Sequence, residues 1–153
     1  MQKATTTGTG KYERLLERCR DVKPAPTAVA FPCEASAIAG PVEAAQLGLI
    51  APILVGPARQ IEAAAKAAGV DLGGIEIVDV PDAHAAAERA VALVREGRAE
   101  VLMKGSLHTD ELLGAVVSRE KGLRTGRRIS HVFLMDVPTY HKPLLVTDGA
   151  INI

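Results

Sequence analysis

The stretch with the most chemical potential runs from Lys104 to Thr109, directly after a short apolar segment. A lysine at the end of a buried strand must bring its charge to water or to an anion. Gly105 lets the backbone approach a ligand closely, Ser106 and Thr109 supply hydroxyl groups, and a helix that opens here presents free N–H groups. The pattern favours an anion site. The alternative is a purely structural role for the same residues, with a lysine that reaches solvent, a glycine turn and a helix cap.

A second candidate is a basic segment between Arg119 and Arg128. Arginine forks match the oxygens of a phosphate in pairs, so the segment could bind a phosphorylated ligand together with the Lys104 loop. By itself such a segment is more often a solvated loop. Its basic residues are Arg119, Lys121, Arg124, Arg127 and Arg128.

A third group lies near the C-terminal end of the sequence, where Ser130 and His131 precede an apolar segment and Asp148 follows another. A histidine beside apolar residues is usually a packed core or edge residue, and the spacing assigns no Ser-His-Asp order. Asp148 before Gly149 favours a turn, with a helix cap or a ligand-facing carboxylate as alternatives. The histidines lack metal-ligand spacing, so we expect no metal site.

Composition limits the classes of function. The 153 residues carry 18 basic and 18 acidic side chains and therefore no net charge, which argues against nucleic-acid binding. No apolar run approaches the roughly 20 residues that span a bilayer. The only cysteines, Cys19 and Cys33, form neither a disulfide framework nor a zinc signature and fit a reducing compartment. We expect residues 1–10 to be a disordered lead-in without a signal peptide, and the protein to be cytoplasmic.

Apolar segments alternate with helical patterns along the rest of the chain. This alternation predicts an α/β fold: a mostly parallel, open sheet with helices on both faces. Ligands of such sheets bind beyond the carboxyl ends of the strands, where the Lys104 loop would lie. The predicted helices are 11–20, 41–47, 57–68, 83–96 and 110–117, and the predicted strands are 27–31, 52–55, 75–79, 101–103, 131–135 and 144–147.

Taken together, these segments resemble the phosphate acetyl/butyryl transferase family. The resemblance covers nearly everything from Lys11 onward, and the set of motifs is quite specific. The Ser-His form is closer to the butyryl branch and to phosphate acetyltransferase modules fused to hydratases. The matching stretches are 52–57, 83–109 with its Met-Lys-Gly-Ser-Leu-His-Thr run, 123–126, 129–132 and 147–152.

The resemblance implies reversible acyl transfer between coenzyme A and inorganic phosphate, by direct attack of the CoA thiolate on the acyl phosphate, with CoA as substrate and no cofactor. It also implies two α/β lobes and a homodimer of the full-length protein. The family's catalytic Asp, Ser and Arg in the later part of its chain have no counterpart here. We therefore expect residues 11–153 to be the first lobe of a two-lobed acyltransferase, truncated and inactive alone.

Residue by residue, Lys104, Ser106 and Thr109 match the family's phosphate-facing loop. Arg124 matches its arginine before the serine-containing strand, where it would polarise the acyl phosphate. Ser130 would donate a hydrogen bond, and His131 would line the cleft. Asp148 would orient the far wall of that cleft or cap the segment that follows it.

Two alternative functions stay open. One is a non-catalytic module that binds a phosphorylated metabolite or CoA. The other is a metal- and NADP-dependent decarboxylating dehydrogenase, which would require clustered Asp ligands that the sequence lacks near Lys104.

Overall fold

The computed structural model describes residues 10–152 of the chain. They divide into two compact units, one formed by Lys23–Arg124 and the other by the segments before Lys23 and after Arg124. The predicted lead-in, residues 1–10, lies outside the described residues except for Gly10, which is the N-cap of the first helix.

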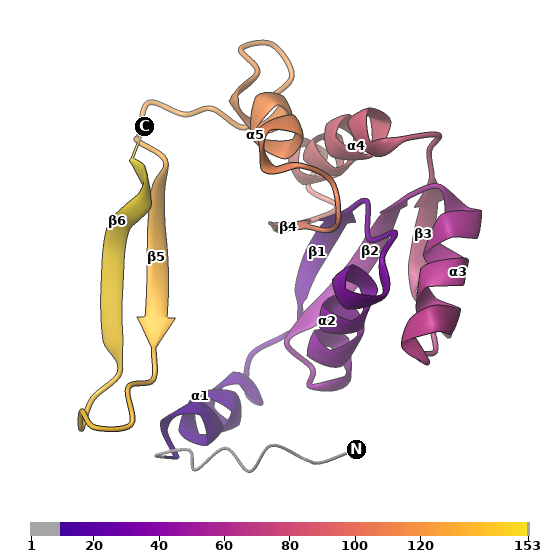
Figure 1. The fold of residues 1–153 in the computed structure, drawn as a ribbon. Helices are drawn as coiled ribbons and strands as arrows, with labels where there is room; N and C mark the ends of the chain where they lie inside the picture. Colours follow the sequence, from indigo (N-terminus) through magenta and orange to yellow (C-terminus); the bar gives the residue numbers. More distant parts are fainter. Residues whose placement is uncertain (1–9, 153) are drawn as a thin grey trace. The chain divides into compact units, whose positions relative to one another are not determined.

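The larger unit is built on a four-stranded parallel sheet with the strand order β3-β2-β1-β4 (Figure 1). Parallel strands buried on both faces are apolar without alternation, and here they carry runs of Ala, Val, Ile and Leu. The register aligns β1 with β2 through Val29 and Leu54, and β1 with β4 through Ala30 and Lys104. The strands are β1 (Ala25–Ala30), β2 (Ile50–Gly56), β3 (Glu76–Asp79) and β4 (Val101–Lys104).

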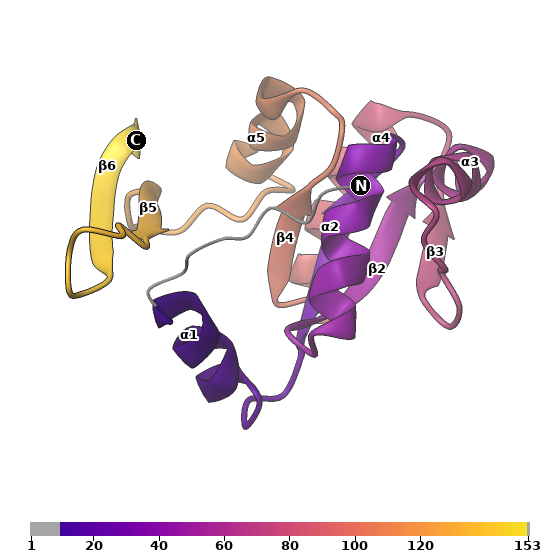
Figure 2. The same cartoon turned by 60° about the horizontal axis from the view of Figure 1, so that its bottom comes forward.

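Helices cover both faces of this sheet, as the sequence predicted (Figures 1 and 2). On one face, α2 (Ala35–Gln46) and α3 (Ala58–Ala68) pack against Val29 and Leu54. On the other, α4 (Ala83–Arg95) and α5 (Thr109–Val117) pack against alternate residues of the same strands, such as Ala28 and Val55. The small alanine side chains of α4 let it lie close to the sheet.

Most helix ends agree with the sequence prediction, but the start of α2 does not. Asp82 caps α4 as expected, because its carboxylate accepts a 2.8 Å hydrogen bond from the backbone N–H of Ala85. Proline favours the first helical position, which predicted that the second helix would begin at Pro41. It begins at Ala35 instead, with Pro41 inside it. Burial of Ile38 and Val42 against the sheet outweighs the hydrogen bond that a proline cannot donate.

The smaller unit contains α1 (Lys11–Cys19) and an antiparallel pair of strands, β5 (Ser130–Met135) and β6 (Leu144–Asn152). These two strands were predicted within the mostly parallel sheet, but they form a two-stranded ribbon of their own, and β6 extends five residues past its predicted end at Thr147. Local apolar composition indicates a strand but not its partner. The ribbon leaves many apolar side chains exposed, among them Phe133 at 56% and Leu145 at 69%.

Lys11 ties α1 to the turn that joins β5 and β6. Its side chain is only 3% exposed, and its ammonium group forms a 2.7 Å ion pair with Asp136. It also donates 2.8 Å hydrogen bonds to the carbonyl oxygens of Val137 and Tyr140. Three acceptors thus match the three N–H donors of a buried ammonium, which satisfies its charge away from water. The sequence pattern predicted the helix but not this role of its first residue.

Candidate functional site

The Lys104–Thr109 loop lies at the carboxyl edge of the parallel sheet, where the sequence placed it. The backbone N–H of Gly105 donates a 2.8 Å hydrogen bond to the carbonyl oxygen of Ala30, at the end of the neighbouring strand β1. A Cβ atom on Gly105 would lie 2.5 Å from the carbonyl oxygens of both Ala30 and Phe31. Glycine is therefore required here because another backbone approaches it, and the loop is held against the end of β1.

Ser106 joins this loop to the loop that follows β1. Its hydroxyl donates a 2.8 Å hydrogen bond to the carbonyl oxygen of Phe31 and accepts a 3.2 Å hydrogen bond from the backbone N–H of Cys33. The single hydroxyl proton is thus directed at the protein. Phe31 adopts a positive φ of 54°, which is uncommon for a bulky residue, so the Ser106 contacts stabilise a strained turn.

Lys104 bends over its own loop. Its ammonium group donates hydrogen bonds to the carbonyl oxygens of Leu107, at 2.7 Å, and Gly105, at 3.1 Å. Those two bonds use two of its three N–H donors, and the side chain is exposed to solvent. A positive charge is therefore fixed above the carboxyl end of β4, with one donor left for an anion.

Thr109 is the first residue of α5, so its backbone lies in the N-terminal turn of the helix. That turn also contains Asp110 and Glu111, and the Glu111 carboxylate accepts a 2.9 Å hydrogen bond from the backbone N–H of His108. Two carboxylates at a helix N-terminus already interact with its partial positive charge and oppose a further anion there. An anion at this loop would thus rely on Lys104 more than on the helix.

Arg124 is exposed and ends the larger unit. Of the other basic residues in its segment, Lys121 lies 4.0 Å from the Glu88 carboxylate, while Arg127 and Arg128 belong to the smaller unit. The basic segment is therefore divided between the two units.

Ser130 and Asp148 come together at one end of the β5–β6 ribbon, and His131 follows Ser130 in β5. The hydroxyl of Ser130 donates a hydrogen bond to Oδ1 of Asp148, and the hydroxyl of Thr147 donates one of 3.2 Å to Oδ2. Asp148 has a φ of 60°, in the left-handed region that aspartate tolerates better than most residues. The His131 ring packs edge-on against Phe133, with ring centroids 4.0 Å apart. Its buried Nδ1 has no hydrogen-bond partner among residues 10–152.

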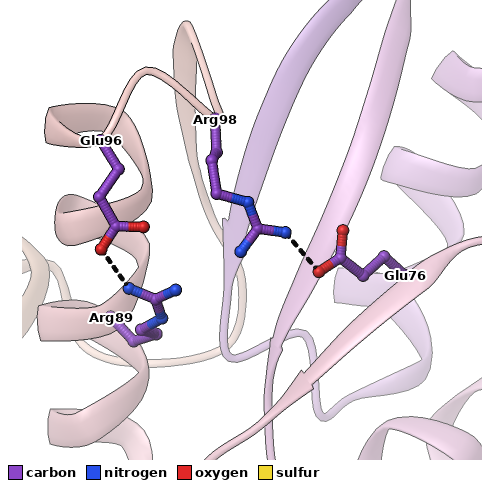
Figure 3. Close-up of polar contacts among 4 residues, drawn as sticks. All are labelled: Glu76, Arg89, Glu96 and Arg98. Atoms are coloured by element: carbon purple, nitrogen blue, oxygen red, sulfur yellow. Dashed lines mark hydrogen bonds and ion pairs between the residues drawn. The ribbon is translucent and has the colours of Figure 1, made fainter.

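A cavity of about 440 Å³ lies between α4 and the segment around α5, and Lys121 is the one residue of the predicted basic segment that lines it. Its cations already have protein partners. Arg89 pairs with Glu96 at 2.6 Å (Figure 3), and Arg95 donates a 3.1 Å hydrogen bond to the carbonyl oxygen of Glu120. The hydrogen bond from Arg89 lowers the pKa of Glu96. Of these two contacts, the one made by Arg95 joins α4 to the segment that follows α5, whereas the Arg89–Glu96 pair runs along α4.

Cys33 lies beside Ser106 at the carboxyl edge of the sheet. Burial raises the pKa of its thiol from 9.0 to about 11, because the thiolate would be poorly solvated there. The thiol is therefore protonated at neutral pH and unsuited to act as a nucleophile.

The structure thus brings the predicted residues into two groups, one in each unit. The larger unit contains one loop with Lys104, Ser106 and Thr109, and its last residue is Arg124. The ribbon of the smaller unit contains Ser130, His131 and Asp148. Within residues 10–152 no group of three His, Cys, Asp or Glu side chains is arranged to hold a metal ion. A search of the same residues finds no helix long and apolar enough to cross a membrane.

Comparison with curated proteins shows strong similarity to two related groups of enzymes. The chain is 57% identical over 143 residues to a phosphate acetyltransferase of Rhizobium meliloti, covering 94% of this chain and 45% of that protein. It is 50% identical over 139 residues to a phosphate acetyltransferase of Rickettsia felis, covering 91% of this chain and 40% of that protein. A phosphate butyryltransferase of Clostridium beijerinckii is 38% identical over 141 residues, with 92% and 47% covered. No family model matches the chain.

Solved structures support the fold. A phosphotransacetylase from Streptococcus pyogenes superimposes with a TM-score of 0.74 over 94% of this chain and 52% of that one, at 16% identity. A branched-chain phosphotransacylase from Enterococcus faecalis superimposes with a TM-score of 0.57 over 84% of this chain and 44% of that one, at 24% identity.

The chain therefore has an α/β fold that matches about half the length of the solved phosphotransacetylase structures. Over nearly its whole length it is homologous to the phosphate acetyltransferases and butyryltransferases, which confirms the resemblance predicted from its motifs. It spans less than half the length of these curated relatives.

Proposed function

We propose that the protein to which this chain belongs is a phosphate acetyl- or butyryltransferase, which converts acyl-CoA and phosphate to acyl phosphate and CoA. The observation that carries the proposal is the 57% identity to a phosphate acetyltransferase over 143 residues. Lys104 supports it, because its ammonium group is fixed at the carboxyl edge of the sheet, where α/β proteins bind ligands.

In this proposal the cations bind the phosphoryl group. Lys104 offers its remaining N–H donor, and Arg124 offers a planar fork that matches two phosphate oxygens. Thr109 contributes a hydroxyl at the start of α5. Ser106 acts indirectly, because its hydroxyl holds the turn at Phe31 against the Lys104 loop.

The reaction needs no covalent enzyme intermediate. In the direction of acyl-CoA synthesis, the CoA thiolate attacks the carbonyl carbon of the acyl phosphate, a C–S bond forms, and the C–O bond to phosphate breaks. Negative charge builds on the carbonyl oxygen and then on the departing phosphate. An arginine aimed at that charge stabilises the transition state, so we assign this role to Arg124. We further propose that the intact protein is a cytoplasmic homodimer that binds neither nucleic acid nor membrane and uses no metal or other cofactor.

The test is phosphate-dependent release of CoA from acetyl-CoA and butyryl-CoA by the intact gene product, with the 153-residue chain assayed beside it. We expect turnover by the intact protein and about a 10²- to 10³-fold loss of kcat in Arg124→Ala, because a charge that stabilises the transition state is removed. Arg98→Ala is the matched control, since Arg98 is an exposed arginine that pairs with Glu76 at 2.6 Å.

Absence of turnover by the intact protein with either substrate would contradict the proposed activity. Binding of phosphate or CoA without turnover would then identify a binding module. Turnover with Arg124→Ala unaffected would leave the activity in place and remove Arg124 from the site.

A further inference from the structure

The end of the ribbon that carries Ser130 and Asp148 is a pronounced β-bulge. Val132 of β5 faces Thr147 of β6, but Ser130, two positions earlier, faces Asn152, five positions later. The extra residues of β6 leave the regular ladder at Asp148. Bulges of this kind re-aim a side chain and are common beside functional sites.

Asp148 has a positive φ of 60° at this bulge, which places it in the left-handed region. Aspartate adopts this region more readily than most residues that carry a Cβ atom. The conformation lets its carboxylate accept hydrogen bonds from two hydroxyl groups, those of Ser130 and Thr147. A positive φ is uncommon outside glycine, and such positions are candidate functional positions.

The hydrogen-bond donors at the bulge can be assigned from chemistry. An ionised carboxylate only accepts hydrogen bonds, so the single proton of the Ser130 hydroxyl points at Asp148. The oxygen of Ser130 then offers only lone pairs to any other partner. The Asp148 carboxylate adds a negative charge beside it, and both side chains are exposed. The pair is therefore an acceptor site, and it repels an anion.

We propose that Asp148 is a positioning residue that orients Ser130 as a hydrogen-bond acceptor for an N–H group of the CoA substrate. The inference rests on the proposed transferase function, whose two substrates differ in their hydrogen-bond donors. The pantetheine arm of CoA carries uncharged amide N–H donors apart from its phosphate groups, whereas inorganic phosphate has its negative charge on one small group. The serine at the bulge then recognises CoA rather than phosphate. The family resemblance implied that Ser130 donates a hydrogen bond, and the two roles make opposite predictions.

The test measures KM for acyl-CoA and KM for phosphate separately in the intact protein, with three variants. Ser130→Ala removes the acceptor. Asp148→Gly and Asp148→Asn both tolerate a positive φ, so neither adds backbone strain. Asparagine keeps an oxygen that accepts the Ser130 proton, whereas glycine keeps none. Thr147→Val is the control, because it removes the other hydroxyl bonded to Asp148 and leaves Ser130 unchanged.

We expect Ser130→Ala and Asp148→Gly each to raise KM for acyl-CoA about three- to tenfold, the effect of one lost hydrogen bond, and to leave KM for phosphate within about twofold. The Asp148→Asn variant should stay near the parent, and so should Thr147→Val. Rescue by asparagine separates a positioning role from a general loss of structure, which would affect both substrates.

A rise in KM for phosphate instead would overturn the proposal and make Ser130 a phosphate donor. Equal rises for both substrates, or no change in any variant, would also overturn it. If the parent protein shows no turnover, the proposed function fails, and calorimetric titration with CoA alone then tests the acceptor site. In that measurement, CoA affinity reduced by Asp148→Gly and retained by Asp148→Asn supports the proposal, and equal affinities reject it.

Discussion

The two units of this chain use similar apolar strands in opposite ways. In Lys23–Arg124 the central strands are covered on both faces, so that Leu54 of β2 has no exposed surface. In the ribbon, β5 and β6 also carry apolar runs, yet Leu145 is 69% exposed. Two-stranded ribbons are marginally stable without a cover, whereas a sheet between two helical layers supplies its own core. The composition of a strand therefore does not determine its burial, because burial depends on the helices that cover the strand.

The two serines of the predicted site differ in the group that accepts their hydroxyl proton. Each directs its single proton at the protein: Ser106 at the carbonyl oxygen of Phe31, and Ser130 at the carboxylate of Asp148. A carbonyl at the end of β1 makes Ser106 part of a connection between two loops. A carboxylate at a bulge makes Ser130 part of an exposed acceptor pair. The same residue type thus stabilises a scaffold in one unit and presents lone pairs to solvent in the other.

The largest expected difference between the units is in the free energy of unfolding that one leucine contributes. Leu54→Ala should lower the free energy of unfolding of the larger unit by about 2–5 kcal/mol, because it removes buried methyl groups and leaves a cavity. Leu145→Ala should change stability by less than about 0.5 kcal/mol, as expected for an exposed side chain. Urea unfolding followed by circular dichroism measures both. Similar losses for the two variants would show that the ribbon is covered in solution.

A smaller effect should separate the two glycines that border the predicted site loops. Gly105→Ala should destabilise the larger unit by about 1–3 kcal/mol, because the new Cβ would lie 2.5 Å from two carbonyl oxygens and the loop would have to move. Gly149→Ala is the matched control in the ribbon, where no atom lies within 4 Å of an added Cβ. Equal unfolding midpoints for the two variants would contradict the close approach of the Lys104 loop to β1.

The smallest effect should be a pH dependence that belongs to the larger unit alone. Because burial raises the pKa of Cys33 from 9.0 to about 11, its contribution to stability is complete below pH 9 and is lost as the pH rises from 9 to 11. Cys33→Ser should therefore flatten the decline in stability of Lys23–Arg124 between pH 8 and pH 10.5. Cys19→Ser, in the other unit, should leave that decline unchanged. A decline that persists in Cys33→Ser would assign it to other groups.

Much of the larger unit follows from the sequence because its signals are local. Apolar runs, the cap at Asp82 and the glycines after helices predict strands and helices in order, and alternation of the two predicts a parallel sheet. The position of the Lys104 loop follows as well, since a loop after a parallel strand lies at the carboxyl edge. The start of α2 was wrong because burial of Ile38 and Val42 outweighed the preference of Pro41 for a helix start.

Tertiary structure alone decided the features that depend on residues distant in sequence. Lys11 is buried by acceptors about 126 positions away, and no local pattern announces such a partner. The exposure of the ribbon depends on which strands pair, which composition does not specify. Ser130 and Asp148, 18 positions apart, meet only because a bulge turns the carboxylate back across the ribbon. The sequence by itself therefore determined that the Lys104 loop lies at the carboxyl edge of the sheet, because local periodicity identifies the strand that precedes it. Where each hydroxyl proton points was decided by long-range contacts.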